Sequence, residues 1–284
     1  MTDDTGNDEP SIEVGYGWLS DRIGTAMETV LGLQIADTSA MYADDQYLHP
    51  IYRSVQEGVV QCLLVALDHL RFLLWSLENR DEPYPYAQFT LIRTAITAAS
   101  TALWMLSGNT PDERRIRALE FNLKDIRSYV AWIDTIKAFP ENQNFSPEVQ
   151  AKADAEAVEM DRRQDWIVQQ ANSLLNPPKQ FTRGSFASRT SDTEMVRTAG
   201  AAIPVMGGFD PAITLLNTWQ TMSGYAHARP WPTLPGREIK ETDPTTNVQT
   251  VTQKGDPNRL LDAAFRALYA VEEAVRRMVS LSAA

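Results

Sequence analysis

The segment 219–231, WQTMSGYAHARPW, holds the side chains best suited to chemistry. His227 is one of three histidines in the chain, Ser223 stands four residues before it, and Arg229 stands two residues after it. Residues four apart on a helix share a face. Ser223 can therefore serve as a nucleophile, His227 as its base, and Arg229 as a cation for developing negative charge. The segment contains no acidic residue to orient the histidine and no Gly-x-Ser-x-Gly turn, which argues against acyl transfer. The alternative is that His227 only ends a helix, where a cation is favoured, and that Pro230 forces the chain out.

Arg93 is the second candidate, because it interrupts the most apolar helical segment, TLIRTAITAAS. A buried cation without a partner is expensive. Arg93 therefore either reaches outward to solvent or joins a polar seam with Thr97 and Ser100, which continue the same face. Asp68, in the segment ALDHLRF, is the expected partner of Arg93 if their two helices are neighbours. We expect the adjacent His69 at the surface or at the boundary of the core.

No metal or cofactor is expected. His49, His69, His227 and nearby carboxylates offer enough ligands on paper, but the chain has no H-x-x-x-H or H-E-x-x-H spacing. It also has no Gly-rich phosphate loop. The lone cysteine, Cys62, lies in the apolar run VVQCLLVAL and is expected to be a buried thiol. We expect most of the seven tryptophans in the core or between helices, rather than in a base-stacking platform.

The elements around these residues are predicted to be almost entirely helical. We expect helices over 14–34, 49–80 and 87–108, from 110 to at least 133, from 146 to about 174, over 193–202, from 210 through the opening segment, and from about 258 to 280. Apolar residues spaced by three and four over 55–77, and a Thr-Pro-x-Glu capping box at 110–113, are the strongest signals. REIKE and VQTVTQ flank TDPTTN before the last helix, which indicates a surface β-hairpin or, alternatively, a flexible loop. The pattern predicts an all-α, multi-helix bundle with this small hairpin insertion.

Length and charge limit the classes of function. The 284 residues are 43% hydrophobic and carry a net charge of −11, which argues against non-specific binding to a phosphate backbone but leaves room for a local basic patch. We expect residues 1–11 to be a disordered acidic tail and 12–284 to be a single domain. No apolar run approaches the roughly 20 residues of a membrane span, and the start of the chain does not resemble a secretion signal. A cytoplasmic protein without a membrane partner is expected.

Four segments carry a family resemblance: DHL, LIRTAITAASTALWML, PDERRIRALEFNLKDIR and SGYAHARPW. Over about 55–127 and 214–231 the chain resembles an uncharacterised actinobacterial helical-bundle family, which is distantly similar to the HEPN superfamily. That superfamily occurs in toxin–antitoxin and anti-phage systems, and many of its members are metal-independent ribonucleases. The resemblance implies RNA as the target, and HEPN sites that form between two chains imply a homodimer.

The HEPN signature is an arginine, four to six residues, and then a histidine, late in one helix. His227 matches the histidine, but Gln220, Thr221 and Met222 occupy the positions where the arginine would stand. Arg93, from another helix, or Arg229 would have to replace it. The resemblance then implies His227 as acid and base, with one of these arginines stabilising the phosphate. The alternative is a non-catalytic protein-binding or regulatory bundle in which the Arg93–Asp68 pair is structural.

Overall fold

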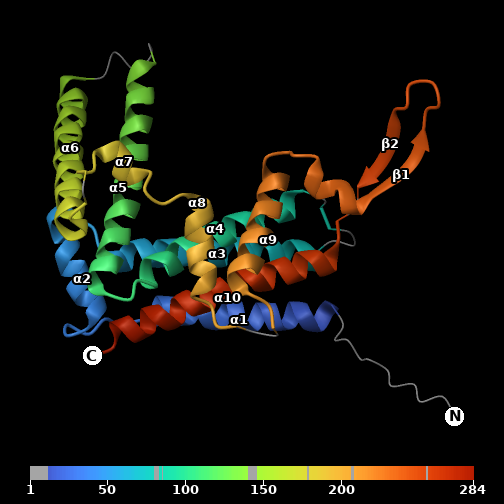
Figure 1. The fold of residues 1–284 in the computed structure, drawn as a ribbon, viewed down its shortest axis with the longest axis horizontal. Helices are drawn as coiled ribbons and strands as arrows, with labels where there is room; N and C mark the ends of the chain where they lie inside the picture. Colours follow the sequence, from blue (N-terminus) through green and yellow to red (C-terminus); the bar gives the residue numbers. More distant parts are fainter. Residues whose placement is uncertain are drawn as a thin grey trace. The chain divides into compact units, whose positions relative to one another are not determined.

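The computed structural model describes residues 12–79, 83–84, 86–139, 146–177, 179–205, 208–253 and 255–284. The disordered tail expected over 1–11 lies outside these residues. The helices are α1 (Ile12–Gly32), α2 (Ala40–Leu48), α3 (Val55–Glu78), α4 (Ala87–Leu106), α5 (Pro111–Ala138), α6 (Pro147–Leu175), α7 (Arg183–Ala187), α8 (Asp192–Ala201), α9 (Pro211–Ala226) and α10 (Pro257–Ser282), with 3₁₀ turns η1 (His49–Ile51) and η3 (Trp231–Gly236). Strands β1 (Arg237–Thr242) and β2 (Gln249–Gln253) form an antiparallel hairpin before α10 (Figure 1). The all-α bundle with a small hairpin insertion is confirmed.

The chain divides into two compact units. Unit 1 holds the described residues up to Leu33, Val60–Leu103 and Met195–Val279. Unit 2 holds Gln34–Val59, Trp104–Glu194 and Ser280–Ala284. That the two units form the single domain expected over 12–284 stays a prediction.

Unit 1 is built on the apolar stripe of α3. All seven residues that the sequence places on this stripe are buried: Val55, Val59, Leu63, Leu67, Leu70, Leu74 and Leu77. Spacings of three and four put them on one side of the helix, and burial of that side stabilises the helix more than intrinsic propensity does. The prediction of a core-facing α3 is confirmed, although Val55 and Val59 at its start belong to unit 2.

In unit 1, α9 packs on α4 with Ser223 against Arg93 and Trp219 against Thr97. Helix α1 runs beside α10 in the same direction (Figure 1). Gly15 on α1 permits the close approach to α10, because a Cβ there would lie 2.5 Å from Leu261 Cδ2. Further along, the Arg22 guanidinium donates from Nε to Glu272 Oε1 at 2.7 Å. The same guanidinium lies 5.0 Å from the centre of the Tyr269 ring, so packing, charge and a cation–π contact all join α1 to α10.

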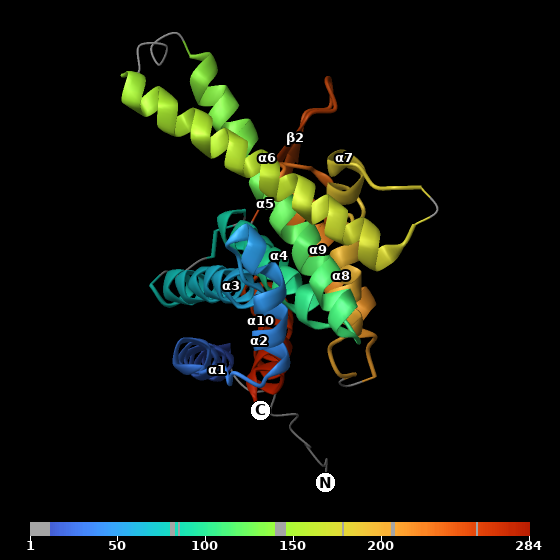
Figure 2. The same cartoon turned by 90° about the vertical axis from the view of Figure 1, so that its left-hand side faces the viewer.

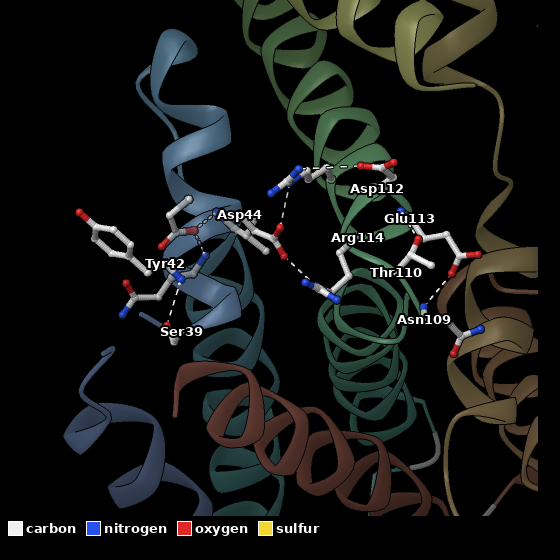
Figure 3. Close-up of polar contacts among 12 residues, drawn as sticks. Ser39, Tyr42, Asp44, Asn109, Thr110, Asp112, Glu113 and Arg114 are labelled. Carbon is white, nitrogen blue, oxygen red and sulfur yellow. Dashed lines mark hydrogen bonds and ion pairs between the residues drawn. The ribbon is translucent and has the colours of Figure 1, made fainter. Parts of the chain in front are cut away.

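Unit 2 centres on the antiparallel pair α5 and α6, which lie side by side in Figures 1 and 2. Helix α2 packs on α5 through Asp44, whose carboxylate accepts from Arg114 Nε at 2.7 Å and from Arg115 Nε at 3.0 Å (Figure 3). Helix α2 is not predicted from the sequence. Its nine residues have little amphipathic pattern, and Ser39, which caps it by accepting from the Tyr42 N–H at 3.2 Å, is a weak signal alone.

The predicted start of α5 is confirmed with one change in its capping box. Thr110 Oγ1 accepts from the Glu113 N–H at 3.2 Å, as expected (Figure 3). The Glu113 carboxylate accepts from the N–H of Asn109 at 2.7 Å, rather than from that of Thr110. The caps at Asp210 and Ser146 also form, each accepting an N–H of the first turn of its helix.

One helix over 49–80 is a wrong prediction. The chain makes the 3₁₀ turn η1, adopts a left-handed conformation at Tyr52 with φ 53°, and begins α3 only at Val55. The carboxylate of Asp45 caps this new start, because its Oδ1 accepts from the N–H groups of Val55 at 2.7 Å and Gln56 at 3.1 Å. A cap supplied from ten residues away leaves no local sequence signal.

Helices α3 and α4 are each long and apolar enough to cross a bilayer by length and composition alone. In their most apolar windows, 44% and 61% of the residues are buried within the fold, and buried helices of proteins outside membranes pass the same test. The expectation that no segment reaches this length does not hold by this measure. Cytoplasmic localisation stays a prediction.

Candidate functional site on α4 and α9

Arg93 and Ser223 meet across the α4–α9 contact of unit 1. Arg93 Nε donates to Ser223 Oγ at 3.1 Å, and the guanidinium carbon lies 6.0 Å from the centre of the Trp219 ring. Both side chains are half-buried. The sequence proposed these two residues separately as site residues, and the fold brings them together.

Trp219 and Thr97 extend this contact one helical turn further. The Trp219 indole Nε1 donates to Thr97 Oγ1 at 2.9 Å, and Thr97 Oγ1 donates to the Arg93 carbonyl at 2.9 Å. The polar seam considered from the sequence therefore forms, with Arg93 and Thr97 of α4 facing Ser223 and Trp219 of α9. Ser100, the third expected member, is buried, and its hydroxyl has no partner among the described residues.

His227 is exposed at the end of α9. It is the C-cap residue, and its backbone N–H donates to the Ser223 carbonyl at 3.0 Å. Within the part of the chain that the structure describes, its imidazole makes no hydrogen bond or ion pair. His227 follows Ser223 by one turn along the chain, and its side chain lies in solvent at the end of α9.

The chain beyond His227 leaves α9 in a Schellman turn. Ala228 is left-handed with φ 52°, its N–H donates to the Tyr225 carbonyl at 3.1 Å, and the Arg229 N–H donates to the Gly224 carbonyl at 2.8 Å. Arg229 itself is exposed. Helix α9 ends at His227, as the alternative from the sequence expects, and the left-handed Ala228 breaks the helix before Pro230 is reached.

Packing explains the Gly-Tyr pair that precedes His227. A Cβ on Gly224 would collide with Pro232 Cγ, so glycine admits the returning chain. The Tyr225 hydroxyl donates to the Pro232 carbonyl at 2.8 Å and accepts from Arg259 Nη1 at 3.0 Å, and burial raises its pKa. Its ring stacks on Phe89 of α4 at 4.3 Å between centroids. Sequence reasoning missed Tyr225 and Arg259, which fix the end of α9 against α4 and α10.

The expected Asp68–Arg93 pair is not formed. Asp68 is exposed on α3 and has no ion pair or hydrogen bond with any described residue, while Arg93 bonds Ser223 instead. Asp68 is exposed because the buried stripe of α3 passes through Leu67 and Leu70, which turns Asp68 away from the core. His69 is half-buried, and its Nδ1 lies 2.8 Å from the Val65 carbonyl oxygen, as suits a boundary histidine.

Among the described residues, no group of three or more His, Cys, Asp or Glu side chains is placed to hold a metal ion. Cys62 is buried, and desolvation raises the pKa of its thiol to about 12. That environment suits a structural thiol and not a nucleophile.

The tryptophans depart from expectation. Four of the seven are more than half exposed: Trp18 at 55%, Trp75 at 57%, Trp132 at 57% and Trp231 at 51%. The prediction that most of them lie in the core or between helices was wrong. Composition could not reveal this, because a tryptophan on the outer face of an amphipathic helix looks the same in a sequence as one on the inner face.

Comparison with known proteins assigns the chain to no family. The chain matches no family model, no curated protein and no solved structure. The resemblance to the HEPN superfamily therefore stays a prediction. This site offers one oriented guanidinium, one hydroxyl and one exposed imidazole, a set able to bind an anion and transfer a proton.

Proposed function

We propose that the α4–α9 site binds a phosphodiester of RNA and that the protein is a HEPN-like ribonuclease. The proposal rests on the bond from Arg93 Nε to Ser223 Oγ, which holds the guanidinium against α9, the helix that ends at His227. In this proposal Arg93 of α4 replaces the arginine that the HEPN signature places on the same helix as the histidine.

Arg93 has the donors that phosphate binding needs. A guanidinium carries five N–H groups in a planar fork that matches two phosphate oxygens. Only the Nε–H of Arg93 is used by a described residue, and its two terminal amino groups have no partner in the described ranges. Ser223 and the Trp219 ring hold the side chain in place, so little ordering is needed when an anion binds. Arg229, exposed beyond His227, can add a second cation at the same edge.

The proposed reaction is an internal transesterification. The ribose 2′-oxygen attacks the adjacent phosphorus, the P–O5′ bond breaks, and a 2′,3′-cyclic phosphate and a free 5′-hydroxyl form. His227 takes the 2′-hydroxyl proton and returns a proton to the departing 5′-oxygen, so the net proton count is unchanged. Arg93 and Arg229 stabilise the extra negative charge on the phosphate oxygens.

Binding to a short single-stranded RNA tests the first part of this proposal. Arg93→Ala should weaken binding by about ten- to a hundredfold, because a charge-assisted contact is lost. It should also lower the slope of log affinity against log salt by about 0.7, the value for one phosphate contact in single strands. Arg71→Ala is the matched control, since Arg71 is an exposed arginine of α3 without a partner among the described residues. If Arg93→Ala and Arg71→Ala lose the same amount of RNA affinity, Arg93 does not make the proposed phosphate contact.

A non-catalytic, protein-binding bundle is the second candidate. The exposed tryptophans Trp18, Trp75, Trp132 and Trp231 favour it, because large apolar side chains on a surface often mark interaction sites. On this account purified protein neither binds nor cleaves RNA, and substitution of Arg93 changes only stability. On the ribonuclease account, the protein would act in the cytoplasm as a homodimer within a toxin–antitoxin or anti-phage system. Sedimentation equilibrium would give its oligomeric state, and growth arrest on expression would report toxicity.

A further inference from the structure

A cavity of about 290 Å³ opens where α3 ends and α4 begins, within unit 1. Its lining residues include Phe72, Trp75, Ser76, Tyr84, Gln88 and Leu91. None of its described lining residues is charged. The Arg93–Ser223 site described above shares no residue with it.

Aromatic rings form the outer wall of this cavity. Phe72 and Trp75 stack with their ring centres 5.5 Å apart and their planes 21° apart. They remain 53% and 57% exposed, and Tyr84 is 43% exposed. Three large rings around one opening leave apolar surface in water, which a flat ring entering the cavity would cover.

Gln88 supplies an unused acceptor at the floor. Its side chain is only 1% exposed, and its Nε2 donates to Ser76 Oγ at 2.9 Å. Ser76 Oγ in turn donates to the Leu73 carbonyl at 2.7 Å, so it can only accept from Gln88. This fixes the orientation of the amide and leaves Gln88 Oε1 buried with no described partner. An unsatisfied buried acceptor is costly, and a donor that reached it would recover that cost.

We infer that this cavity binds a small, flat aromatic molecule that carries one N–H or O–H donor. The aromatic wall selects the ring, and Gln88 Oε1 selects the donor. Gln88 Oε1 is not exposed to solvent in the structure, so neighbouring side chains must move for a donor to reach it. Exposed side chains change rotamer within picoseconds to nanoseconds, so movement of surface residues at the opening is fast.

Indole and 1-methylindole form a matched pair of probes, because they differ only in the N–H donor. Titration of the full-length protein, followed by calorimetry and by NMR of the Gln88 amide and the Trp75 indole N–H, measures both affinities. We expect indole to saturate and 1-methylindole to bind about three- to tenfold more weakly, the difference expected for one neutral hydrogen bond. In Gln88→Leu the two probes should bind equally.

Trp132 offers a matched control for the aromatic wall. It is 57% exposed, as Trp75 is, and it also lies beside an aromatic ring three residues earlier in its helix, Tyr129. Trp75→Ala should weaken indole binding at least tenfold, and Trp132→Ala should leave it unchanged. Because Trp75 and Trp132 are surface residues, both variants are expected to fold even if Gln88→Leu does not.

Three results would overturn the inference. The first is that indole shows no saturable binding up to its solubility limit. The second is that 1-methylindole binds the wild-type protein as tightly as indole does. The third is that Trp132→Ala weakens indole binding as much as Trp75→Ala does.

Discussion

Asp44 of α2 and Arg114 of α5 form a buried ion pair in unit 2, with Arg114 Nε 2.7 Å from Asp44 Oδ2. Their side chains are 2% and 7% exposed, and Arg115 Nε reaches the other carboxylate oxygen at 3.0 Å. One carboxylate therefore pairs with two arginines at the α2–α5 contact. Because the pair is buried, loss of either partner leaves a charge away from water, so the pair should matter for stability.

Asp44→Asn should destabilise the protein by about 3–5 kcal/mol, because it leaves Arg114 buried without a counter-charge. Urea unfolding followed by circular dichroism measures the change. Asp112→Asn is the control, since Asp112 is 63% exposed and lies 3.8 Å from Arg115. Its cost should stay below about 1 kcal/mol. A cost for Asp44→Asn no larger than that of the control would show that the pair is dispensable.

Replacing Ala228 with glycine should stabilise the protein by about 0.5–1 kcal/mol. Ala228 is left-handed at φ 52°, a conformation that strains an L side chain and that glycine adopts freely. Ala226→Gly is the control: it lies in the last turn of α9, where glycine should cost a similar amount. Thermal melting should move the two variants in opposite directions, and a lower melting temperature for Ala228→Gly would contradict the argument.

The sequence predicts the elements that local pattern controls and misses those that tertiary contacts control. The stripe on α3, the Thr110 cap and the hairpin all follow from spacing or turn residues. The short α2 and the break at Tyr52 do not, because Asp44 and Asp45 act on residues far along the chain.

The candidate site shows the same division. Arg93 and Ser223 stand out in the sequence because a cation in an apolar helix and a serine one turn before a histidine are unusual. Their contact is not predictable from one sequence, because it depends on how α9 packs on α4 in the folded chain. The sequence also suggested Asp68 as the partner of Arg93. The structure shows that Asp68 faces solvent, because Leu67 and Leu70 are on the buried side of α3.

Cys62 should react slowly with thiol reagents in the folded protein. Burial raises its pKa to about 12, so almost no thiolate is present at pH 8. Labelling should be more than about a hundredfold slower than in the urea-unfolded chain, and it should report opening of α3. The chain has a single cysteine, so the signal comes from one site. Labelling of the native protein within tenfold of the unfolded rate would show that Cys62 is accessible.

Glu159 of α6 should titrate far below an ordinary glutamate. Hydrogen bonds from Arg162 and then Arg163 lower its pKa from 4.5 to about 2. Because the folded pKa is depressed, the stabilisation is present above about pH 4.5 and is lost as the pH falls towards 2. Carbon NMR of the Glu159 carboxyl should show this titration.

Arg162→Ala should raise the titration midpoint of Glu159 towards 4.5. Lys152→Ala should not move it, since Lys152 pairs with Glu148, an exposed carboxylate at the start of α6. A midpoint near 4.5 in the wild-type protein would mean that the two arginines do not hold this carboxylate in solution.

The most direct test of the proposed function is the cleavage of single-stranded RNA in the presence of EDTA, with the products separated by end group. The wild-type protein should produce 2′,3′-cyclic phosphate ends, and His227→Ala should lower the rate by about 10²- to 10⁴-fold. His49→Ala should leave the rate unchanged, because His49 is likewise an exposed C-cap histidine but lies in unit 2. Absence of cyclic phosphate ends, or equal rates for His227→Ala and the wild type, would contradict the assignment of this site.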